Sequence, residues 1–180
     1  MKGLLFCEFI EFLEEQIGDD ETQEIIDSAE LASEGAYSRV GFYDYQELIQ
    51  LLVTTAAYTQ KEAGDLLQSF ANHLFMVFKR DYSSFFDGVT SAAEMLKTID
   101  DHIHVEVKKL YPDAELPEFR YEEKGKELHL YYSSPRPLAG VAHALINACL
   151  LYYKNDQFLD SHEISNDQKS AHFVISKTTR

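Results

Sequence analysis

The chain has 180 residues and a formal net charge of −15, from 31 acidic and 16 basic residues. That length suits one domain with a sizeable core or two tightly packed subdomains, and 45% hydrophobic residues are too many for a disordered chain. The acidic balance, without a cluster of Lys and Arg, would repel a phosphate backbone, so nucleic acid is excluded as a partner.

The cysteines and the N-terminal segment bear on the cellular compartment. Cys7 and Cys149 lie far apart in sequence, which is typical of free buried thiols in a reducing compartment. Residues 1–6 resemble the start of a signal peptide, but Glu8 and Glu11 interrupt the apolar run. No segment reaches the roughly 20 apolar residues of a membrane span. We therefore expect a cytoplasmic protein without a membrane segment.

The first 113 residues have a helical pattern almost throughout. Apolar residues at helix spacing predict a first helix that ends at Gly18. Thr22 is placed to cap a shorter second helix over residues 23–31. Three further helices are predicted over residues 45–58, 61–80 and 90–111.

After Pro117 the pattern becomes strand-like. Residues 119–122 and 128–133 flank a tight-turn composition, which predicts an antiparallel hairpin. A helix and two more strands are predicted over residues 138–154, 162–165 and 171–177.

The expected fold class is α+β, in a single domain of residues 1–180. An N-terminal helical subdomain, about residues 1–113, would pack on a C-terminal antiparallel sheet with a helix, about residues 114–180.

Two histidines lie on the predicted helix over residues 90–111. His102 and His104 flank Ile103 of its apolar stripe, and each is turned about 100° from it. Either imidazole could point inward and ligate heme iron, for which histidine is a usual proximal ligand. Periodicity does not choose between them, and both could instead be solvated or hydrogen-bonded helix residues.

A set of anion-binding side chains follows about two dozen residues later. Tyr132, Ser134 and Arg136 alternate along one face if the strand continues to them. The planar guanidinium binds carboxylates bidentately and the hydroxyls can donate to the remaining oxygens, so the set could clasp the two propionates of a heme. An ordinary exposed strand end often contains such residues as well.

Together these motifs resemble the heme-nitric oxide/oxygen binding (H-NOX) family, which is similar to the heme domain of soluble guanylate cyclase. The resemblance covers essentially the whole chain and implies one heme b between the helical and sheet parts. It rests on four segments: residues 1–3, residues 99–104 before Tyr111-Pro112, residues 116–119, and the Tyr-x-Ser-x-Arg motif at 132–136.

Carried over residue by residue, the resemblance makes His104 the proximal ligand of the iron. Asp101 is then the acidic residue three positions earlier, and His102 is a bystander. The other expected heme contacts are Tyr132, Ser134 and Arg136 at the propionates, Pro117 pressing on the porphyrin, and Leu5 and Leu145 as apolar contacts.

The distal side is expected to be apolar. Oxygen-binding members of the family have a distal tyrosine five residues past the motif arginine, where this chain has Val141. Phe9 and Leu74 at neighbouring distal positions also lack a hydrogen-bond donor, so nitric oxide and carbon monoxide should bind while dioxygen is disfavoured. A small helix rotation could still bring His143 or Asn147 towards the iron.

The resemblance implies a nitric oxide sensor and not an enzyme. Nitric oxide on ferrous heme would weaken the Fe–His104 bond, free the helix over residues 90–111 and let the heme flatten against Pro117. The change would regulate a separate protein, either a sensor histidine kinase or an enzyme that makes or degrades cyclic di-GMP. Some members carry a cysteine-rich zinc site, whose cysteines are missing here, so no zinc is expected.

Two other functions fit the residues. One is an oxygen-binding heme protein, which would need a donor in the distal pocket. The other is a heme-free helical interaction module, in which the aromatic residues form ordinary core and Arg136 lies at the surface.

Overall fold

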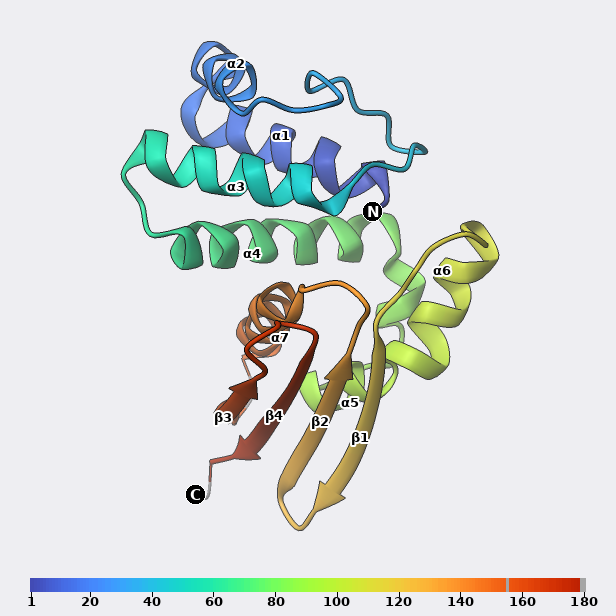
Figure 1. Ribbon diagram of the computed structural model, residues 1–180. Helices are drawn as coiled ribbons and strands as arrows, with labels where there is room; N and C mark the ends of the chain where they lie inside the picture. Colours follow the sequence, from blue (N-terminus) through green and yellow to red (C-terminus); the bar gives the residue numbers. More distant parts are fainter. Residues whose placement is uncertain (155, 179–180) are drawn as a thin grey trace. The chain divides into compact units, whose positions relative to one another are not determined.

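The protein folds as two compact units, residues 1–74 and 75–180, in a computed structural model that describes residues 1–154 and 156–178. The first unit is helical, and the second adds a four-stranded antiparallel sheet (Figure 1). The predicted α+β class is thereby confirmed. The boundary between the units falls inside a helix, whereas the change from helical to strand pattern falls after Pro117. Residues 155, 179 and 180 of the expected domain lie outside the described residues.

The helical unit begins as the sequence predicts. Its helices are α1 (Gly3–Ile17), α2 (Asp19–Ser28), α3 (Tyr45–Thr59) and the first part of α4 (Ala63–Asp81). Gly18 ends α1 at a φ of 95°, which glycine adopts without steric cost. The predicted start of α2 is wrong: the helix begins at Asp19, and Thr22 donates its hydroxyl to the Gly18 carbonyl oxygen at 2.7 Å instead of capping. Acidic residues in the first turn complement the helix dipole there.

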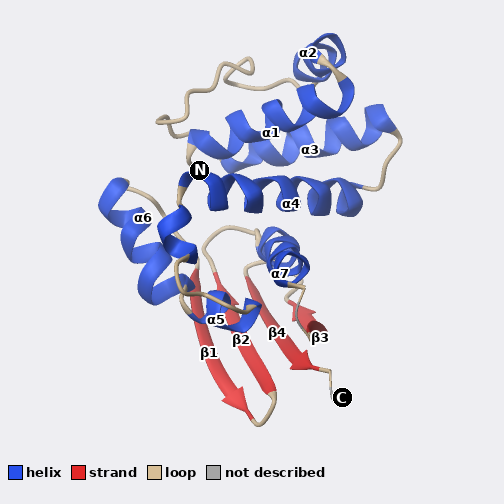
Figure 2. Ribbon diagram, turned by 180° about the vertical axis from the view of Figure 1, so that it is seen from behind, coloured by secondary structure: helices blue, strands red, loops and turns tan. Residues whose placement is uncertain are grey.

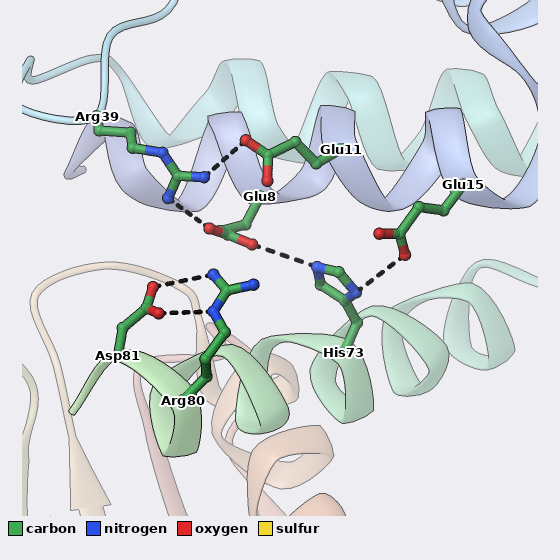
Figure 3. Close-up of polar contacts among 7 residues, drawn as sticks. All are labelled: Glu8, Glu11, Glu15, Arg39, His73, Arg80 and Asp81. Atoms are coloured by element: carbon green, nitrogen blue, oxygen red, sulfur yellow. Dashed lines mark hydrogen bonds and ion pairs between the residues drawn. The ribbon is translucent and has the colours of Figure 1, made fainter. Parts of the chain in front are cut away.

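A buried carboxylate in this unit makes polar contacts with other segments of the chain (Figure 3). Glu8 is fully buried, and its two oxygens lie 2.5 Å from Nη1 of Arg39 and 3.3 Å from Nε2 of His73. Arg39 also donates through Nη2 to Glu11 at 2.6 Å. A charge can be buried here because each carboxylate oxygen has a polar partner. The network joins α1, the loop after α2, and α4.

In the second unit the segment that carries the candidate histidines is not one helix, and the prediction of a continuous helix over residues 90–111 is wrong. The segment consists of α5 (Ala92–Lys97), a π-helical turn (Ile99–His104) and α6 (Val105–Leu110). The backbone N–H groups of His102 and Ile103 both donate to the Thr98 carbonyl oxygen at 3.0 Å. This wide turn accommodates one extra residue and changes the directions of the side chains that follow it.

The sheet has the strand order β1-β2-β4-β3 and is antiparallel throughout. Its strands are β1 (Glu118–Lys124), β2 (Glu127–Ser133), β3 (Gln157–Ile164) and β4 (Ser170–Lys177). The predicted hairpin is confirmed, with Gly125 in the turn at a φ of 63°. The third strand begins earlier than predicted, at Gln157.

One face of the sheet is covered by helices. Leu128, Leu130 and Phe173 are buried on the face that packs against α7 (Ala139–Tyr153). Figure 2 shows α5 and α7 on the same side of the sheet. Alternate residues of β2 therefore point to the opposite side, where no helix of the described residues lies over the sheet (Figure 1). Within the described residues, no helix combines the length and the apolar character needed to cross a bilayer.

Candidate heme-binding site

His104 is the last residue of the π-helical turn, and one of its ring nitrogens is already bonded. Its Nδ1 lies 2.8 Å from Oδ1 of Asp100, one turn earlier. A carboxylate only accepts hydrogen bonds, so the proton of the neutral ring is on Nδ1 and Nε2 carries a lone pair. In the part of the chain that the structure describes, Nε2 has no hydrogen-bond partner.

The environment of His104 favours the neutral ring. The side chain is only 17% exposed, and burial lowers its pKa below the ordinary value, although the hydrogen bond to Asp100 and the charge of Asp100 oppose this. Neutral imidazole is the form that ligates a metal ion. His104 therefore presents an available electron pair from a protected position.

His102 differs from His104 in both exposure and direction. It is exposed, and its ring meets Phe85 at 5.8 Å between centroids. The ring of His104 instead lies near that of Phe119 on β1, at 5.9 Å between centroids. The wide turn thus directs the two imidazoles towards different neighbours, a difference that periodicity alone could not predict.

The aromatic contacts of His104 lead to the predicted anion-binding residues. Phe119 packs edge-on against Tyr132 of β2 at 5.3 Å between ring centroids. Tyr132 is buried, which raises the pKa of its hydroxyl, while a hydrogen bond from Ser134 and the charge of Arg136 lower it. The hydroxyl therefore stays protonated as a donor near neutral pH.

The predicted strand alternation through residue 136 is wrong, because β2 ends at Ser133. Ser134 and Arg136 lie in the loop before α7, where the Ser134 amide donates to the Lys169 carbonyl oxygen at 2.8 Å. The Ser134 hydroxyl accepts from the Arg136 amide at 3.1 Å. A turn therefore gathers the three side chains, in place of the strand geometry that was predicted.

The guanidinium of Arg136 already holds a carboxylate. It forms an ion pair with Glu115, whose side chain is 66% exposed. The donor set fits a heme, because it combines a neutral imidazole with an available Nε2 and an arginine aimed at a carboxylate, as the propionates require.

The other predicted heme contacts are distributed over several elements. Pro117 is half-buried just before β1, and Val141 and Leu145 are half-buried on α7, all in the second unit. Three more belong to the first unit. Leu5 is partly buried and Leu74 is buried. The ring of Phe9 packs on that of Phe70 at 4.9 Å between centroids. The structure brings together His104, Tyr132, Ser134 and Arg136 by contacts within one unit.

His143 and Asn147 of α7 are the two polar residues that a small helix rotation could have brought towards the iron. They contact each other, and His143 also contacts the sheet. His143 stacks on His162 of β3 at 4.3 Å between ring centroids, with Phe173 of β4 at 6.0 Å. Asn147 shares a hydrogen bond of 3.2 Å with Nε2 of His143. Burial, and after it the nearby His162, lowers the pKa of His143. His143 is therefore directed towards β3 and β4.

Sequence reasoning missed two residues of this site. Asp100 is the carboxylate on His104, a contact that the sequence analysis did not predict for any residue. The four-residue spacing of Asp100 and His104 is an ordinary helical contact distance and could have revealed the pair. Phe119 was quoted as part of a motif, but only strand pairing shows that it connects His104 to Tyr132.

The fold and these residues define an α+β domain with a candidate heme site. The family model for Haem-NO-binding proteins matches residues 2–158, so the chain belongs to the H-NOX family of heme gas-sensing domains. Domains of this family are sensors and not catalysts. The comparison with curated proteins found no match.

Solved structures agree with this family membership. The unliganded Fe(II) H-NOX protein from K. algicida is 36% identical, with a TM-score of 0.88, over 100% of this chain and 98% of that one. The H-NOX from Shewanella woodyi, solved with IWP-051 in the Fe(II)CO state, is 32% identical with a TM-score of 0.82, over 100% and 96%. The Fe(II)NO H-NOX from S. oneidensis, at 22% identity and a TM-score of 0.87 over 99% and 100%, supports the fold alone.

Proposed function

We propose that this chain is a cytoplasmic nitric oxide sensor that holds one heme b through His104. The proposal rests on one observation, the continuous path of contacts from the His104 ring through Phe119 and Tyr132 to Arg136. An iron ligand and a propionate anchor must act on one cofactor, so they have to lie near each other, and this path of contacts places them so. Both cysteines are free thiols, in keeping with a reducing compartment.

Asp100 prepares His104 to bind iron. Its carboxylate accepts a hydrogen bond from the Nδ1–H group, so the lone pair of the neutral ring is on Nε2 and directed away from Asp100. A hydrogen bond of this kind also fixes the ring orientation and raises the basicity of the ligating nitrogen. Asp100 thus sets both the direction and the strength of the bond from His104.

Tyr132, Ser134 and Arg136 anchor the carboxylates of the cofactor. The Arg136 guanidinium would exchange its ion pair with Glu115 for a propionate. Glu115 is largely exposed, so it can return to water at little cost. The two hydroxyls donate to the remaining propionate oxygens.

The gas selectivity follows from residues without hydrogen-bond donors. Dioxygen on ferrous iron carries partial negative charge and gains from a donor, whereas nitric oxide needs none. Val141, Leu145, Phe9 and Leu74 supply no donor, and His143 is engaged with His162. We expect nitric oxide and carbon monoxide to bind and dioxygen to be excluded.

The signal begins at the π-helical turn. A bound ferrous heme would supply an iron that takes nitric oxide, and His104 would be the residue that holds this iron or lets it go. Without that bond, His104 would no longer hold the turn Ile99–His104 in place, and this segment and α6 could change their backbone hydrogen bonding. A separate partner that binds the two states unequally reads the change. A sensor histidine kinase or an enzyme of cyclic di-GMP metabolism is the proposed partner.

The direct test is the absorption spectrum of the reduced protein, before and after each gas. We expect a ferrous Soret band at one heme per chain, shifts with nitric oxide and with carbon monoxide, and no stable oxygenated spectrum in air. Colourless protein that cannot be reconstituted with heme would overturn the proposal. A stable spectrum in air would instead assign the domain to oxygen.

A further inference from the structure

A second cavity of the sheet-containing unit lies between α5 and the end of the sheet that carries the β1–β2 hairpin. Its volume is about 240 Å³. It is lined by residues of α5, of the hairpin, and of the paired ends of β3 and β4, all within residues 75–180. None of the described residues that line it belongs to the candidate heme site. The heme proposal therefore leaves this cavity without a role.

Part of the cavity surface is apolar. Leu128 of β2 and Ile175 of β4 are strand partners on the helix-covered face, and they are only 4% and 2% exposed. Ala93 of α5 also lines the cavity. These side chains offer a hydrocarbon group a surface on which to pack away from water.

A buried amide of the lining has a donor that the chain does not use. Gln157, the first residue of β3, is only 7% exposed. The backbone N–H of Ala93 donates to its Oε1 at 3.0 Å, which identifies the oxygen end of the amide and leaves Nε2 as the donor end. Within residues 1–154 and 156–178, Nε2 has no hydrogen-bond partner. An unpaired donor at this depth is costly, so it favours an acceptor that enters the cavity.

The charged groups of the lining divide into acceptors that are occupied and donors that are not. Each of the three glutamates already has a partner: Glu94 with Thr90, Glu123 with Lys97, and Glu127 with His129. By contrast, Lys126 and Lys177 form no ion pair in the part of the chain that the structure describes. Lys177 is also the strand partner of Gln157, so its ammonium group extends from the residue beside the buried amide. The groups that remain for a ligand are therefore all donors.

We propose that this cavity binds a small monocarboxylate. Its carboxylate would accept hydrogen bonds from the Gln157 amide and from the ammonium groups of Lys126 and Lys177, and its hydrocarbon part would pack on Leu128 and Ile175.

The charge and the size of the ligand follow from the lining. Three lysines and three glutamates balance, and the net charge of the chain is −15, so a second negative charge on the ligand would be repelled. The volume of about 240 Å³ is below the roughly 300–1,000 Å³ of cavities that take drug-sized molecules, which limits the ligand to a small acid.

The test is an NMR titration of the full chain as purified, with any heme held in the ferrous carbon monoxide form, using sodium butyrate. We expect saturable shifts of the Gln157 side-chain amide and of the Ala93 backbone amide. Butyramide, which lacks the charge, should bind at least about tenfold more weakly. The dianion succinate should bind no more tightly than butyrate. An unmoved Gln157 amide, equal binding of butyramide, or tighter binding of succinate would overturn the proposal, and this titration needs no variant to fold.

Substitutions of exposed lysines test the donors separately. Lys126→Gln and Lys177→Gln should each weaken butyrate binding about threefold, and the double variant about tenfold. Lys124→Gln is the matched control, because Lys124 lies in the same hairpin on the opposite face of β1 and is paired with Glu122 at 3.0 Å. It should bind butyrate like the unaltered chain. Unchanged affinity in the double variant, or an equal loss in the control, would refute the assignment of the donors.

Discussion

The helical unit and the sheet-containing unit each hold a half-buried histidine beside a carboxylate, and the two pairs differ in which polar atoms remain without a partner. Around Glu8, both carboxylate oxygens contact partners and His73 lies between Glu8 and Glu15 (Figure 3). Around His104, Asp100 occupies Nδ1 alone. A polar network whose groups are all paired holds helices together, whereas one with an available electron pair can bind a ligand.

Electrostatic cost explains the difference. The Glu8 side chain is 1% exposed, and an unpaired charge at that depth would be prohibitive, so its partners are required for folding. Neutral His104 can leave Nε2 unpaired at a smaller cost. The second unit therefore keeps a site that ligation can complete, and mutations in the two places should have different consequences.

The largest effect is expected at the iron ligand. His104→Gly removes the available nitrogen, so heme should be lost from the purified protein and return when imidazole is added. The measurement is heme per chain from the Soret absorbance with and without imidazole. His102→Gly is the control and should retain full heme content. Equal loss in both variants would contradict the assignment of the ligand.

The buried network should respond in stability and not in ligation. Glu8→Gln removes a buried charge from Arg39 and His73, and we expect about 2 kcal/mol of destabilisation, below the range for fully buried pairs because Arg39 can turn to water. Denaturant unfolding measures it. Glu11→Gln, on the same arginine but exposed, should cost about 0.5 kcal/mol. Loss of the Fe–His104 stretching band in Glu8→Gln would contradict this prediction, because it would show that the Glu8 network also affects ligation of the iron.

Heme anchoring should depend on Arg136. Arg136→Ala removes charge-assisted hydrogen bonds worth about 1.5–3 kcal/mol, so heme should transfer to an apoglobin roughly ten- to a hundredfold faster. Glu115→Gln releases the same guanidinium from its competing carboxylate and should slow the transfer slightly. The anchor would be wrong if Arg136→Ala transferred heme at the unaltered rate.

The smallest effect is expected at Asp100. Asp100→Asn replaces the anionic acceptor on Nδ1 of His104 with a neutral amide, which makes Nε2 less basic. The Fe–His stretching frequency in the ferrous resonance Raman spectrum should fall while the heme content stays the same. Asp101→Asn is the control and should leave the frequency unchanged, and a drop there without one in Asp100→Asn would contradict the role of Asp100.

The sequence predicted those parts of the fold whose signal is local. Gly18 ends α1, and α3 begins at Tyr45, where the helix over residues 45–58 was predicted to begin. Alternation and turn composition predicted the hairpin of β1 and β2. The extra residue in the turn at Ile99–His104 escaped prediction, because an α-helix and a π-helical turn present the same apolar spacing over so few residues.

By itself, the sequence determined the α+β class, most helix and strand positions, and the residue types from which a heme site can be built. Only the tertiary structure decided that Asp100 and not Asp101 holds His104, that His143 faces His162, and that Phe119 joins His104 to Tyr132. Those choices depend on backbone winding and strand register. Both are set by contacts between residues far apart in the chain, which local propensity does not contain.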